Sequence, residues 1–389
     1  MEYADIIHRC FRCGYCKFTR EYQDFNCPTY RKFWFETYSP GGRMWLLRAW
    51  LNGEVQSSKR MAEIFYSCVT CGNCVEHCAL DFRDNLVDIF VAARGEMVEK
   101  GLVLPPVRDY LKNIRIHGNP YKEPQQERAR WADGLGIEQY AGQEYLLYIG
   151  CVGSYDERGT KIARAVASVL KKTGLSAGIL GNKEPCDGNE VRLLGESELF
   201  QEMARQNITM FKELGVKKIV TLSPHSYNAF KNEYRELDGN FEVLHYTEAL
   251  NRLVEEGKVS FSGLNETVTY HDPCYLGRHN DVFDAPRNIL RAIPGLALAE
   301  MSKIKKNALC CGGGGGNFFT DIIGSGEGAP GRDRIREALE TGAKAVATAC
   351  PQCAKMLEDA AKAEGVEDRI KVMDIAEIVE AAGMRTAAD

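Results

Sequence analysis

Three cysteines separated by two-residue spacers occur twice within the first 78 residues of this 389-residue chain. The first run, Cys10-Phe11-Arg12-Cys13-Gly14-Tyr15-Cys16, is followed by Cys27-Pro28. The second run begins at Cys68 and is a complete CxxCxxCxxxC that ends at Cys78. Two-residue spacers turn the backbone tightly enough to place three thiolates around one face of a four-iron cluster. The two runs therefore predict two cubane 4Fe-4S clusters.

The fourth thiolate of each cluster must come from outside its own CxxCxxC run. In two-cluster ferredoxins it comes from the opposite motif. This rule groups Cys10, Cys13 and Cys16 with Cys78, and Cys68, Cys71 and Cys74 with Cys27. Two features depart from the ferredoxin pattern, because ten residues separate Cys16 from Cys27 and Ala79 replaces the usual proline after Cys78. A pair of zinc sites is the alternative, but zinc sites seldom use three cysteines at successive two-residue spacers.

Composition narrows the class of protein further. The tight grouping of most of the 15 cysteines indicates metal binding rather than disulfides. A net charge of -5 disfavours a nucleic-acid surface, which needs a basic patch. No stretch approaches the roughly 18 consecutive apolar residues of a membrane span, and the first residues lack the basic and apolar regions of a secretory signal. We expect a cytoplasmic protein with no membrane span of its own, and association with a membrane through a partner subunit stays open.

The C-terminal two thirds contain an internal repeat. The second copy holds His271-Asp272-Pro273-Cys274, then Cys310-Cys311 before five glycines, then Cys350-Pro351-Gln352-Cys353. The first copy holds, in the same order, Cys151, then Cys186-Asp187-Gly188, then Ser223-Pro224-His225-Ser226. Each part of the first copy precedes its counterpart by about 125 residues, and such a fixed offset indicates a duplication.

Strands and helices are predicted to alternate within each copy. Apolar segments at 145–149 and 218–222 in the first copy, and at 267–270 and 345–349 in the second, each end just before a cysteine or its replacement. Alternation of this kind favours a parallel sheet, whose ligands collect beyond the carboxyl ends of the strands. The cysteines of each copy should therefore converge.

The complete second copy offers five thiols, one more than a cubane cluster needs. Adjacent cysteines cannot both point at one corner of a cube, but they can bridge irons in a more open cluster. Glycines 312–316 would let the backbone approach such a cluster closely. A plain flexible glycine loop is the alternative, and a phosphate-binding loop is disfavoured because the final glycine of GxGxxG is missing.

The degenerate first copy has lost three of the five thiols. Its remaining donors, Cys151, Cys186, Asp187 and His225, suit a single zinc or iron ion. The other interpretation is a relic domain that is kept for packing.

The order of two CxxCxxC motifs and a duplicated cysteine-rich (CCG) domain resembles the D-type subunit of heterodisulfide reductase, in which a ferredoxin-like C-type part is fused to a B-type part. It is also similar to the iron-sulfur subunits of glycolate oxidase, lactate utilisation systems and anaerobic glycerol-3-phosphate dehydrogenase. Residues 271–278 and 310–316 carry the most specific part of the likeness. The resemblance implies that a noncubane 4Fe-4S cluster is bound by Cys274, Cys310, Cys311, Cys350 and Cys353. In heterodisulfide reductases two such clusters flank the substrate disulfide, and the degenerate copy lacks the cysteines for one of them.

These features predict the organisation of the chain. We expect an α/β protein with a mostly helical, two-cluster ferredoxin-like domain at residues 1–100 and a linker or wrapping segment at 101–143. A degenerate CCG domain should follow at 144–262, and a complete one that binds the noncubane cluster at 263–389.

Two functions remain in competition. The first is an electron-transfer subunit of a multi-subunit oxidoreductase that relays electrons between a flavin-containing partner and another redox partner, because a row of one-electron clusters suits coupling to a flavin. The sequence has no nucleotide-binding fingerprint, so the flavin should lie on another chain. The alternative is a disulfide or thiol reductase that acts at the noncubane cluster, with His271, Arg278 and His225 orienting substrate or protons. A hydrogen-bonded structural residue is the plainer interpretation of each histidine.

Overall fold

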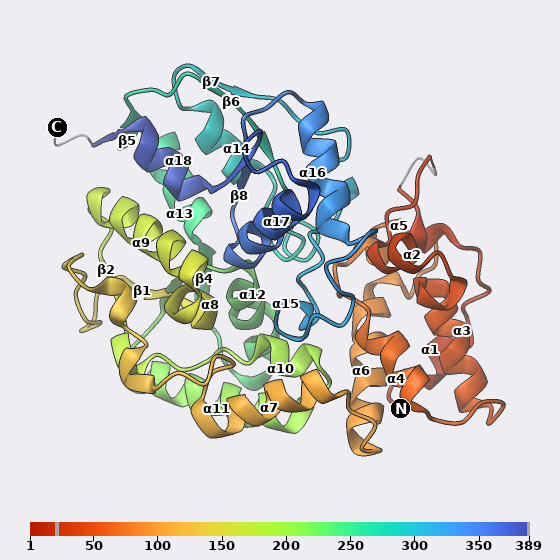
Figure 1. The fold of residues 1–389 in the computed structure, drawn as a ribbon. Helices are drawn as coiled ribbons and strands as arrows, with labels where there is room; N and C mark the ends of the chain where they lie inside the picture. The colour runs from red at the N-terminus through yellow and green to blue at the C-terminus, as the bar shows by residue number, and fades with distance from the viewer. Residues whose placement is uncertain (20–22, 387–389) are drawn as a thin grey trace.

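The computed structural model describes residues 1–19 and 23–386 (Figure 1). A small helical part at the N-terminus lies beside two α/β parts, each built on a parallel sheet. The predicted α/β class, with a helical N-terminal region and a duplicated C-terminal region, is confirmed. No helix among the described residues is both long and apolar enough to cross a bilayer.

Short helices hold the two cysteine motifs in the N-terminal part. They are α1 (Ala4–Ile7), α2 (Pro28–Phe33), α3 (Pro40–Leu51), α4 (Lys59–Tyr66), α5 (Asn73–His77) and α6 (Leu86–Glu99). Ser39 and Ser58 begin α3 and α4 by accepting hydrogen bonds from the backbone N–H groups of Gly42 and Met61. The buried face of α6 includes Ile89, Phe90 and Ala93, as the helical spacing predicts.

Gly95 lies inside α6, which continues to Glu99. A Cβ atom on Gly195 would lie 2.5 Å from the backbone nitrogen of Gly95, so α6 packs closely against the first α/β part at this point.

The segment between the helical part and the first sheet is partly helical. It contains α7 (Pro105–His117), which has Pro105 in its first turn, and short 3-10 turns at Gln125–Glu127 and Arg130–Ala132. Arg115 on α7 forms an ion pair of 3.3 Å with Glu196, and Trp131 is buried. The segment thus packs along the first α/β part.

The first α/β part has the strand order β2-β1-β3-β4, all parallel. Its strands are β1 (Tyr145–Tyr148), β2 (Ala177–Gly178), β3 (Lys218–Thr221) and β4 (Glu242–His245). Its helices are α8 (Gly150–Tyr155), α9 (Glu157–Lys172), α10 (Asn189–Leu193), α11 (Ser197–Glu213), α12 (Pro224–Asn228) and α13 (Tyr246–Glu255). Every residue of β1 is buried, as expected for a central parallel strand.

The second α/β part repeats the same topology in the order β7-β6-β8-β9. Its strands are β6 (Glu266–Tyr270), β7 (Leu296–Leu298), β8 (Ala345–Thr348) and β9 (Lys371–Asp374). Its helices are α14 (Asp284–Arg291), α15 (Asn317–Thr320), α16 (Pro330–Glu340), α17 (Pro351–Glu364) and α18 (Ile375–Ala382). A short antiparallel pair, β5 (Val259–Phe261) with β10 (Met384–Thr386), joins the end of the first part to the end of the second.

Polar side chains join the two α/β parts. Arg158 on α9 pairs with Glu358 on α17 and, at 2.5 Å, with Glu377 on α18. The hydroxyl of Tyr246 donates to Asp374 at 2.6 Å, and both groups are buried. These contacts bring the carboxyl ends of both sheets to a shared interface.

Candidate iron-sulfur sites

The structure interleaves the eight cysteines of the N-terminal motifs. Burial raises the pKa of Cys78, and the nearby thiols of Cys13 and Cys10 raise it further. Burial likewise raises the pKa of Cys74, with added contributions from Cys68, Cys71, Cys16 and Cys27. Cys78 thus lies near the cysteines of the first run, and Cys27 lies near Cys71 and Cys74 of the second run and near Cys16 of the first.

The two CxxCxxC loops share one backbone conformation. Arg12 and Thr70 occupy equivalent positions and have φ of 54° and 46°, and the following glycines Gly14 and Gly72 have φ of 87° and 73°. A left-handed conformation costs a non-glycine residue roughly 1–2 kcal/mol, so the turns are held by their surroundings. Backbone hydrogen bonds from Gly41 to Cys16 and from Asn73 to Cys71 lower the pKa of each thiol, although burial dominates at Cys16 and the contact with Cys310 dominates at Cys71.

These surroundings fit iron-sulfur clusters. Buried thiols with raised pKa values are poorly placed to ionise by themselves, whereas positively charged irons would hold them as thiolates. Backbone N–H groups directed at sulfur are a usual feature of cluster binding, and they tune its potential.

The five cysteines of the second copy converge at the carboxyl ends of β6 and β8. None has more than 6% of its surface exposed. The sulfurs of Cys311 and Cys353 lie 3.3 Å apart, and Cys310 hydrogen-bonds Cys274. Cys350 begins α17 and its sulfur accepts from the backbone N–H of Cys353 at 3.4 Å. Five buried thiols at one point fit an iron-sulfur cluster.

The glycines after Cys311 have a definite conformation. The backbone N–H groups of Gly312 and Gly313 lie 3.3 Å and 3.5 Å from the sulfurs of Cys310 and Cys311. Gly312, Gly315 and Gly316 have φ of 91°, 61° and 82°, which side chains would disfavour. The loop therefore presents N–H donors to the cysteines and is more than a flexible connection.

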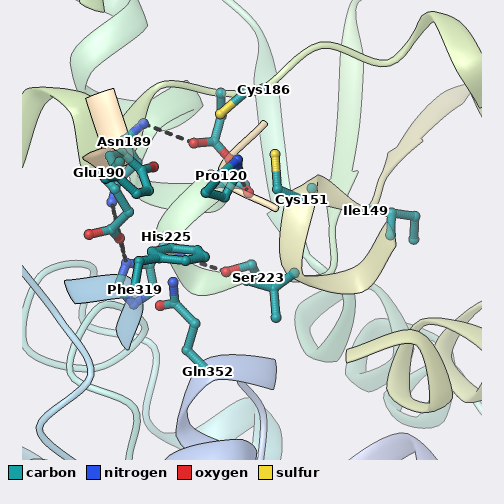
Figure 2. Close-up of a pocket in the computed structure, with 15 residues that line it drawn as sticks. Pro120, Ile149, Cys151, Cys186, Asn189, Glu190, Ser223, His225, Phe319 and Gln352 are labelled. Carbon is teal, nitrogen blue, oxygen red and sulfur yellow. Dashed lines mark hydrogen bonds and ion pairs between the residues drawn. The ribbon is translucent and has the colours of Figure 1, made fainter. Parts of the chain in front are cut away.

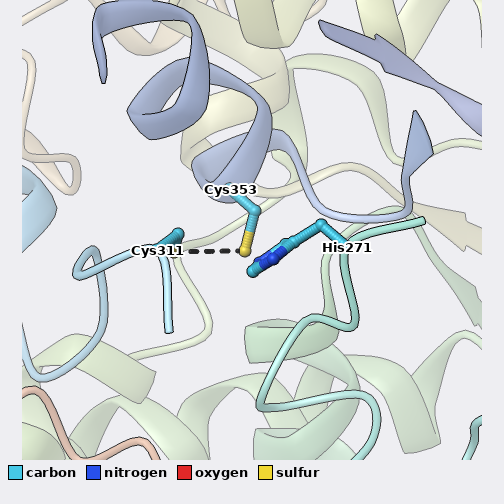
Figure 3. A group of neighbouring side chains, drawn as sticks. All are labelled: His271, Cys311 and Cys353. Carbon is cyan, nitrogen blue, oxygen red and sulfur yellow. Dashed lines mark hydrogen bonds between the residues drawn. The ribbon is translucent and has the colours of Figure 1, made fainter. Parts of the chain in front are cut away.

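His271 lies against these cysteines, as Figure 3 shows. One ligand atom each from His271, Cys311 and Cys353 falls within 4.8 Å of the others. The side chain of Arg334 donates to Nδ1 of His271 at 3.1 Å, which leaves the proton of a neutral ring on Nε2. Burial lowers the pKa of His271 despite the hydrogen bond to Cys311. A neutral ring that lies beside the sulfurs of Cys311 and Cys353 accounts for this arrangement.

Arg278 is used as a clamp. Its guanidinium donates to the carbonyl oxygens of Cys71 at 2.7 Å and of Ala308 at 2.6 Å. It therefore ties the second N-terminal motif to the loop that precedes Cys310. The sequence suggests Arg278 as a residue that orients the substrate, and these hydrogen bonds engage its guanidinium with the backbone instead.

The N-terminal and C-terminal cysteine groups touch. The hydrogen bond between the thiols of Cys71 and Cys310, together with burial, raises the pKa of Cys71 well above its ordinary value. A sulfur that belongs to one predicted cluster site thus contacts a sulfur of another. Nothing in the spacing of the motifs indicated this contact, because it depends on how separate parts of the chain pack.

The degenerate copy surrounds a narrow cavity of about 30 Å³, shown in Figure 2. Cys151 and Cys186 line it together and hydrogen-bond each other. The buried guanidinium of Arg128 lies 3.4 Å from the sulfur of Cys151 and pairs with Glu184 at 2.9 Å. Hydrogen bonding from Cys186, followed by the charge of Arg128, lowers the pKa of Cys151 despite its burial.

The other two predicted donors of this copy, Asp187 and His225, also line this cavity. Asp187 accepts a hydrogen bond of 2.6 Å from the hydroxyl of Ser226. His225 pairs through Nδ1 with Glu190 at 2.7 Å and hydrogen-bonds Cys350 of the second copy. Both side chains thus have hydrogen-bond partners, and all four predicted donors line the same cavity. A metal ion bound by these donors stays a prediction.

Sequence reasoning missed several charged residues of these sites. Glu190, Arg128, Arg334 and Arg94 are all buried and contact cysteines, their histidines or their loops. Isolated charged residues carry no spacing signal, so their burial could not be inferred from the chain alone.

Family models and curated relatives agree with this arrangement. The model of the cysteine-rich domain (CCG) matches residues 145–231 and 268–358, and the model of the 4Fe-4S dicluster domain matches residues 6–82. The chain is 32% identical over 419 residues to the D-type subunit of the dihydromethanophenazine:CoB-CoM heterodisulfide reductase of Methanosarcina barkeri, covering 98% of this chain and 95% of the relative.

Two longer relatives are also similar. A probable iron-sulfur-binding oxidoreductase, FadF, of Bacillus subtilis is 38% identical over 333 residues, which are 82% of this chain and 46% of the relative. The EtfAB:quinone oxidoreductase of Syntrophomonas wolfei is 36% identical over 337 residues, with the same two coverages. The chain thus spans about half the length of these two relatives.

Proposed function

The chain belongs to the family of D-type heterodisulfide reductase subunits, which are iron-sulfur proteins, and on that premise we propose that it relays electrons within a multi-subunit oxidoreductase. In this proposal two cubane 4Fe-4S clusters are held by the N-terminal sets Cys10, Cys13, Cys16, Cys78 and Cys68, Cys71, Cys74, Cys27. A noncubane 4Fe-4S cluster is held by Cys274, Cys310, Cys311, Cys350 and Cys353. The proposal also keeps the four-part division at residues 1–100, 101–143, 144–262 and 263–389.

The contact between Cys71 and Cys310 carries the proposal. It places a cysteine of the second N-terminal set next to a cysteine of the C-terminal set. Arg278 supports the same junction by binding the carbonyl of Cys71. Such an arrangement would leave little protein between two electron carriers, which favours transfer between them.

The first N-terminal set offers the route to a partner. Cys13 is exposed, whereas Cys10, Cys16 and Cys78 are buried. Phe11 and Tyr15, which flank Cys13 in the motif, are 64% and 41% exposed. An exposed apolar surface beside a cluster ligand suits a redox partner, so we propose that electrons enter or leave at Cys13.

The chemistry expected of the bound clusters is one-electron storage. At the C-terminal set, the chain's own residues keep water from the sulfurs, direct backbone N–H groups toward them and fix their spacing through the glycine loop. Hydrogen bonds to sulfur and burial are the means by which a protein sets cluster potentials.

The partners in this proposal are a flavin-containing redox subunit and a second redox subunit. A row of one-electron carriers suits exchange with a flavin, which handles electrons singly or in pairs. The name of the Syntrophomonas relative records exchange between EtfAB and a quinone, and the Methanosarcina relative is by name one subunit of its enzyme. We place the complex in the cytoplasm, because free thiols in this number suit a reducing compartment.

A disulfide or thiol reductase is the second candidate, and the cavity in Figure 2 is the observation that favours it. The cavity is lined by Gln352 of the second copy and lies next to His225, which contacts Cys350. Its volume of about 30 Å³ corresponds to about one water molecule. A thiol-linked substrate would therefore need the cavity to open, which is why we favour the relay.

Counting iron and recording electron paramagnetic resonance test the proposal. The chain is purified without oxygen, and its iron, sulfide and zinc are measured before and after adding thiols or disulfides. About twelve irons per chain, as three four-iron clusters require, with no spectral response to thiols, supports the relay. A thiol-sensitive signal supports the reductase. About eight irons would contradict the C-terminal cluster, and zinc in place of iron would contradict both functions.

A further inference from the structure

The complete copy holds the backbone of the second cysteine motif through two adjacent residues. Nε of Arg278 donates to the carbonyl oxygen of Cys71 at 2.7 Å. Nε2 of His279 lies 2.9 Å from the carbonyl oxygen of Thr70. A carbonyl oxygen only accepts, so Nε2 carries the proton of this second hydrogen bond. Two successive carbonyl groups of the motif are thus fixed by one segment of the complete copy.

Aromatic packing fixes the ring of His279 in this position. Tyr275 stacks on it with ring centroids 4.2 Å apart and ring planes only 3° from parallel. The hydroxyls of Tyr275 and Thr70 lie 2.8 Å apart, so the same segment also holds the side chain of Thr70. A Cβ atom on Gly72 would lie 3.2 Å from Nε2 of His279, which shows how closely the ring approaches the loop. The turn at Thr70 is therefore held through its backbone, its side chain and its packing.

The N–H groups of the same two peptide planes have no acceptor. The carbonyl of Thr70 and the N–H of Cys71 share one trans plane, as do the carbonyl of Cys71 and the N–H of Gly72. Each N–H therefore points away from the residue that holds its carbonyl. Both Cys71 and Gly72 are buried, and neither N–H donates to an oxygen of the described residues. Buried N–H groups without an acceptor are rare, and the sulfurs of a bound cluster would accept from these two.

The first cysteine motif makes the same turn without this support. Arg12 has φ of 54° where Thr70 has 46°, so the two turns are equivalent. Arg12 and Cys13 are exposed, whereas Thr70 and Cys71 are buried. Among the described residues, no side chain donates to the carbonyl oxygens of Arg12 and Cys13. The complete copy therefore acts on one N-terminal set and leaves the other free.

We propose that Arg278 and His279 are positioning residues for the cluster of the second N-terminal set. By fixing the carbonyl groups of the loop, they direct the N–H groups of Cys71 and Gly72 toward that cluster and so set its reduction potential. This inference rests on the proposed function, because it needs a 4Fe-4S cluster at that set. It gives the complete copy control over a cluster whose proposed ligands all lie in the N-terminal part.

The expected effect follows from the location of the added electron. Reduction adds negative charge that spreads onto the sulfurs, and N–H donors directed at them stabilise the reduced form. A peptide plane whose carbonyl is held cannot rotate, so its N–H keeps one direction. Without the hydrogen bond from His279, the plane between Thr70 and Cys71 is free to turn and its N–H donates less well. Reduction of this cluster should then become less favourable.

Substitutions can remove each donor while keeping the packing. His279→Phe keeps a ring that can stack on Tyr275 and deletes the donor to the carbonyl of Thr70. Arg278→Met keeps an unbranched side chain and deletes the donor to the carbonyl of Cys71. His117→Phe is the matched control, because it makes the same chemical change at an exposed position on α7.

The readout is the reduction potential of each cluster, measured by redox titration with electron paramagnetic resonance on the anaerobic full chain. The signal lost in Cys74→Ser, which lacks a proposed ligand, identifies the second N-terminal cluster. We expect His279→Phe to lower the equilibrium constant for reducing that cluster about threefold, where tenfold corresponds to about 59 mV for a one-electron couple. Arg278→Met should shift the same cluster in the same direction by at least about twofold. The first N-terminal cluster of both variants, and all clusters of His117→Phe, should keep the wild-type potentials.

Distinct results would overturn the inference. A second N-terminal cluster that is present in His279→Phe with an unchanged potential would refute it, because the contacts would then only hold the parts together. Equal shifts of both N-terminal clusters would also reject it, since they would indicate a general disturbance. If His279→Phe fails to assemble the cluster, Arg278→Met decides, and a shift below about twofold there rejects the inference. Wild-type protein with zinc in place of iron would instead contradict the proposed function, and the inference would fall with it.

Discussion

Single buried charges connect the parts of this molecule, and Arg128 illustrates the energetic consequence. Its side chain is buried, pairs with Glu184 and also donates to the carbonyl of Pro185 at 3.0 Å. Replacement of one partner in a buried ion pair leaves an uncompensated charge and costs about 3–5 kcal/mol. We expect Arg128→Met to lower the free energy of unfolding by that amount, measured by anaerobic chemical denaturation.

Arg130 provides the matched control for this prediction. It lies two residues away, and its side chain is 77% exposed in an ion pair with Glu127. Exposed pairs contribute little, so Arg130→Met should change the free energy of unfolding by less than about 0.5 kcal/mol. Equal losses in the two variants would show that the buried contacts of Arg128 are not the cause.

Asp374 predicts a pH dependence of stability near neutrality. The carboxyl accepts from the hydroxyl of Tyr246 and from the backbone N–H of Ala376. Burial, with a contribution from Glu377 and against the charge of Arg158, raises the pKa of Asp374 from 3.8 to about 7. Between those pH values the folded chain keeps a proton that the unfolded chain releases. Its contribution to stability is therefore complete below pH 3.8 and is lost as the pH rises through about 7.

The variant Asp374→Asn tests this dependence, because an amide keeps an acceptor oxygen but does not titrate. The wild type should lose stability relative to the variant between about pH 4 and pH 7, by about 1.4 kcal/mol per pH unit at most, and the loss should level off above pH 7. Denaturation curves of both proteins at several pH values measure the difference. Parallel pH profiles would rule out a titrating Asp374.

The sequence indicates the candidate ligands of these sites better than it indicates the residues that surround the ligands. The cysteines can be proposed as ligands from the sequence because their regular spacing limits how the backbone can place them. His225 is, from the sequence, a candidate ligand of its own copy, and the structure adds that its ring pairs with Glu190 and stacks on Tyr275 of the other copy. The direction of a side chain across an interface depends on packing that no local pattern records.

At the scale of elements, the glycine loop after Cys311 is where separate motifs approach most closely. A Cβ atom on Gly315 would lie 2.5 Å from the carbonyl oxygen of Cys68, and the residue has φ of 61°. Gly315→Ala must therefore displace the second cysteine motif as well as strain the backbone. We expect it to lower stability by about 1–3 kcal/mol beyond the strain itself.

Gly324 separates the two contributions. It has φ of 69°, but an added Cβ would meet nothing within 4 Å. Gly324→Ala should therefore show the backbone strain alone, roughly 1–2 kcal/mol. Thermal or chemical denaturation of both variants gives the comparison, and similar losses would mean that the close approach at Cys68 is relieved without cost.

The regular elements of the α/β parts could be predicted from the chain. Segments expected as strands at 145–149, 218–222, 267–270 and 345–349 agree with β1, β3, β6 and β8 within a residue or so at each end. Short apolar segments next to glycine or proline indicate such strands from the local sequence alone. The helix at Pro105–His117 is instead expected, from the sequence, to be a linker, because prolines usually indicate irregular structure. Here Pro105 and Pro106 occupy the first turn of the helix, where proline is well tolerated.

At the scale of the whole molecule, Arg94 joins all three parts of the chain. Its buried guanidinium donates to the carbonyls of Phe65, Tyr66 and Cys68, to Leu193 of the first α/β part at 2.7 Å, and to Gly315 of the second at 3.0 Å. One side chain thus holds the helical part, the degenerate copy and the glycine loop in a fixed arrangement. That arrangement also sets the contact between Cys71 and Cys310.

Arg94→Met should therefore loosen the whole assembly. The substitution removes this donor from all of these carbonyls, and unsatisfied buried groups cost about 1–3 kcal/mol each when no water replaces the partner. We expect a loss of at least about 3 kcal/mol and a broader unfolding transition, since parts that unfolded together would begin to unfold separately. Calorimetry of the anaerobic protein measures both. Arg108→Met, at an exposed position on α7, is the control and should keep a sharp transition. A single sharp transition in Arg94→Met would mean that apolar packing alone couples the three parts.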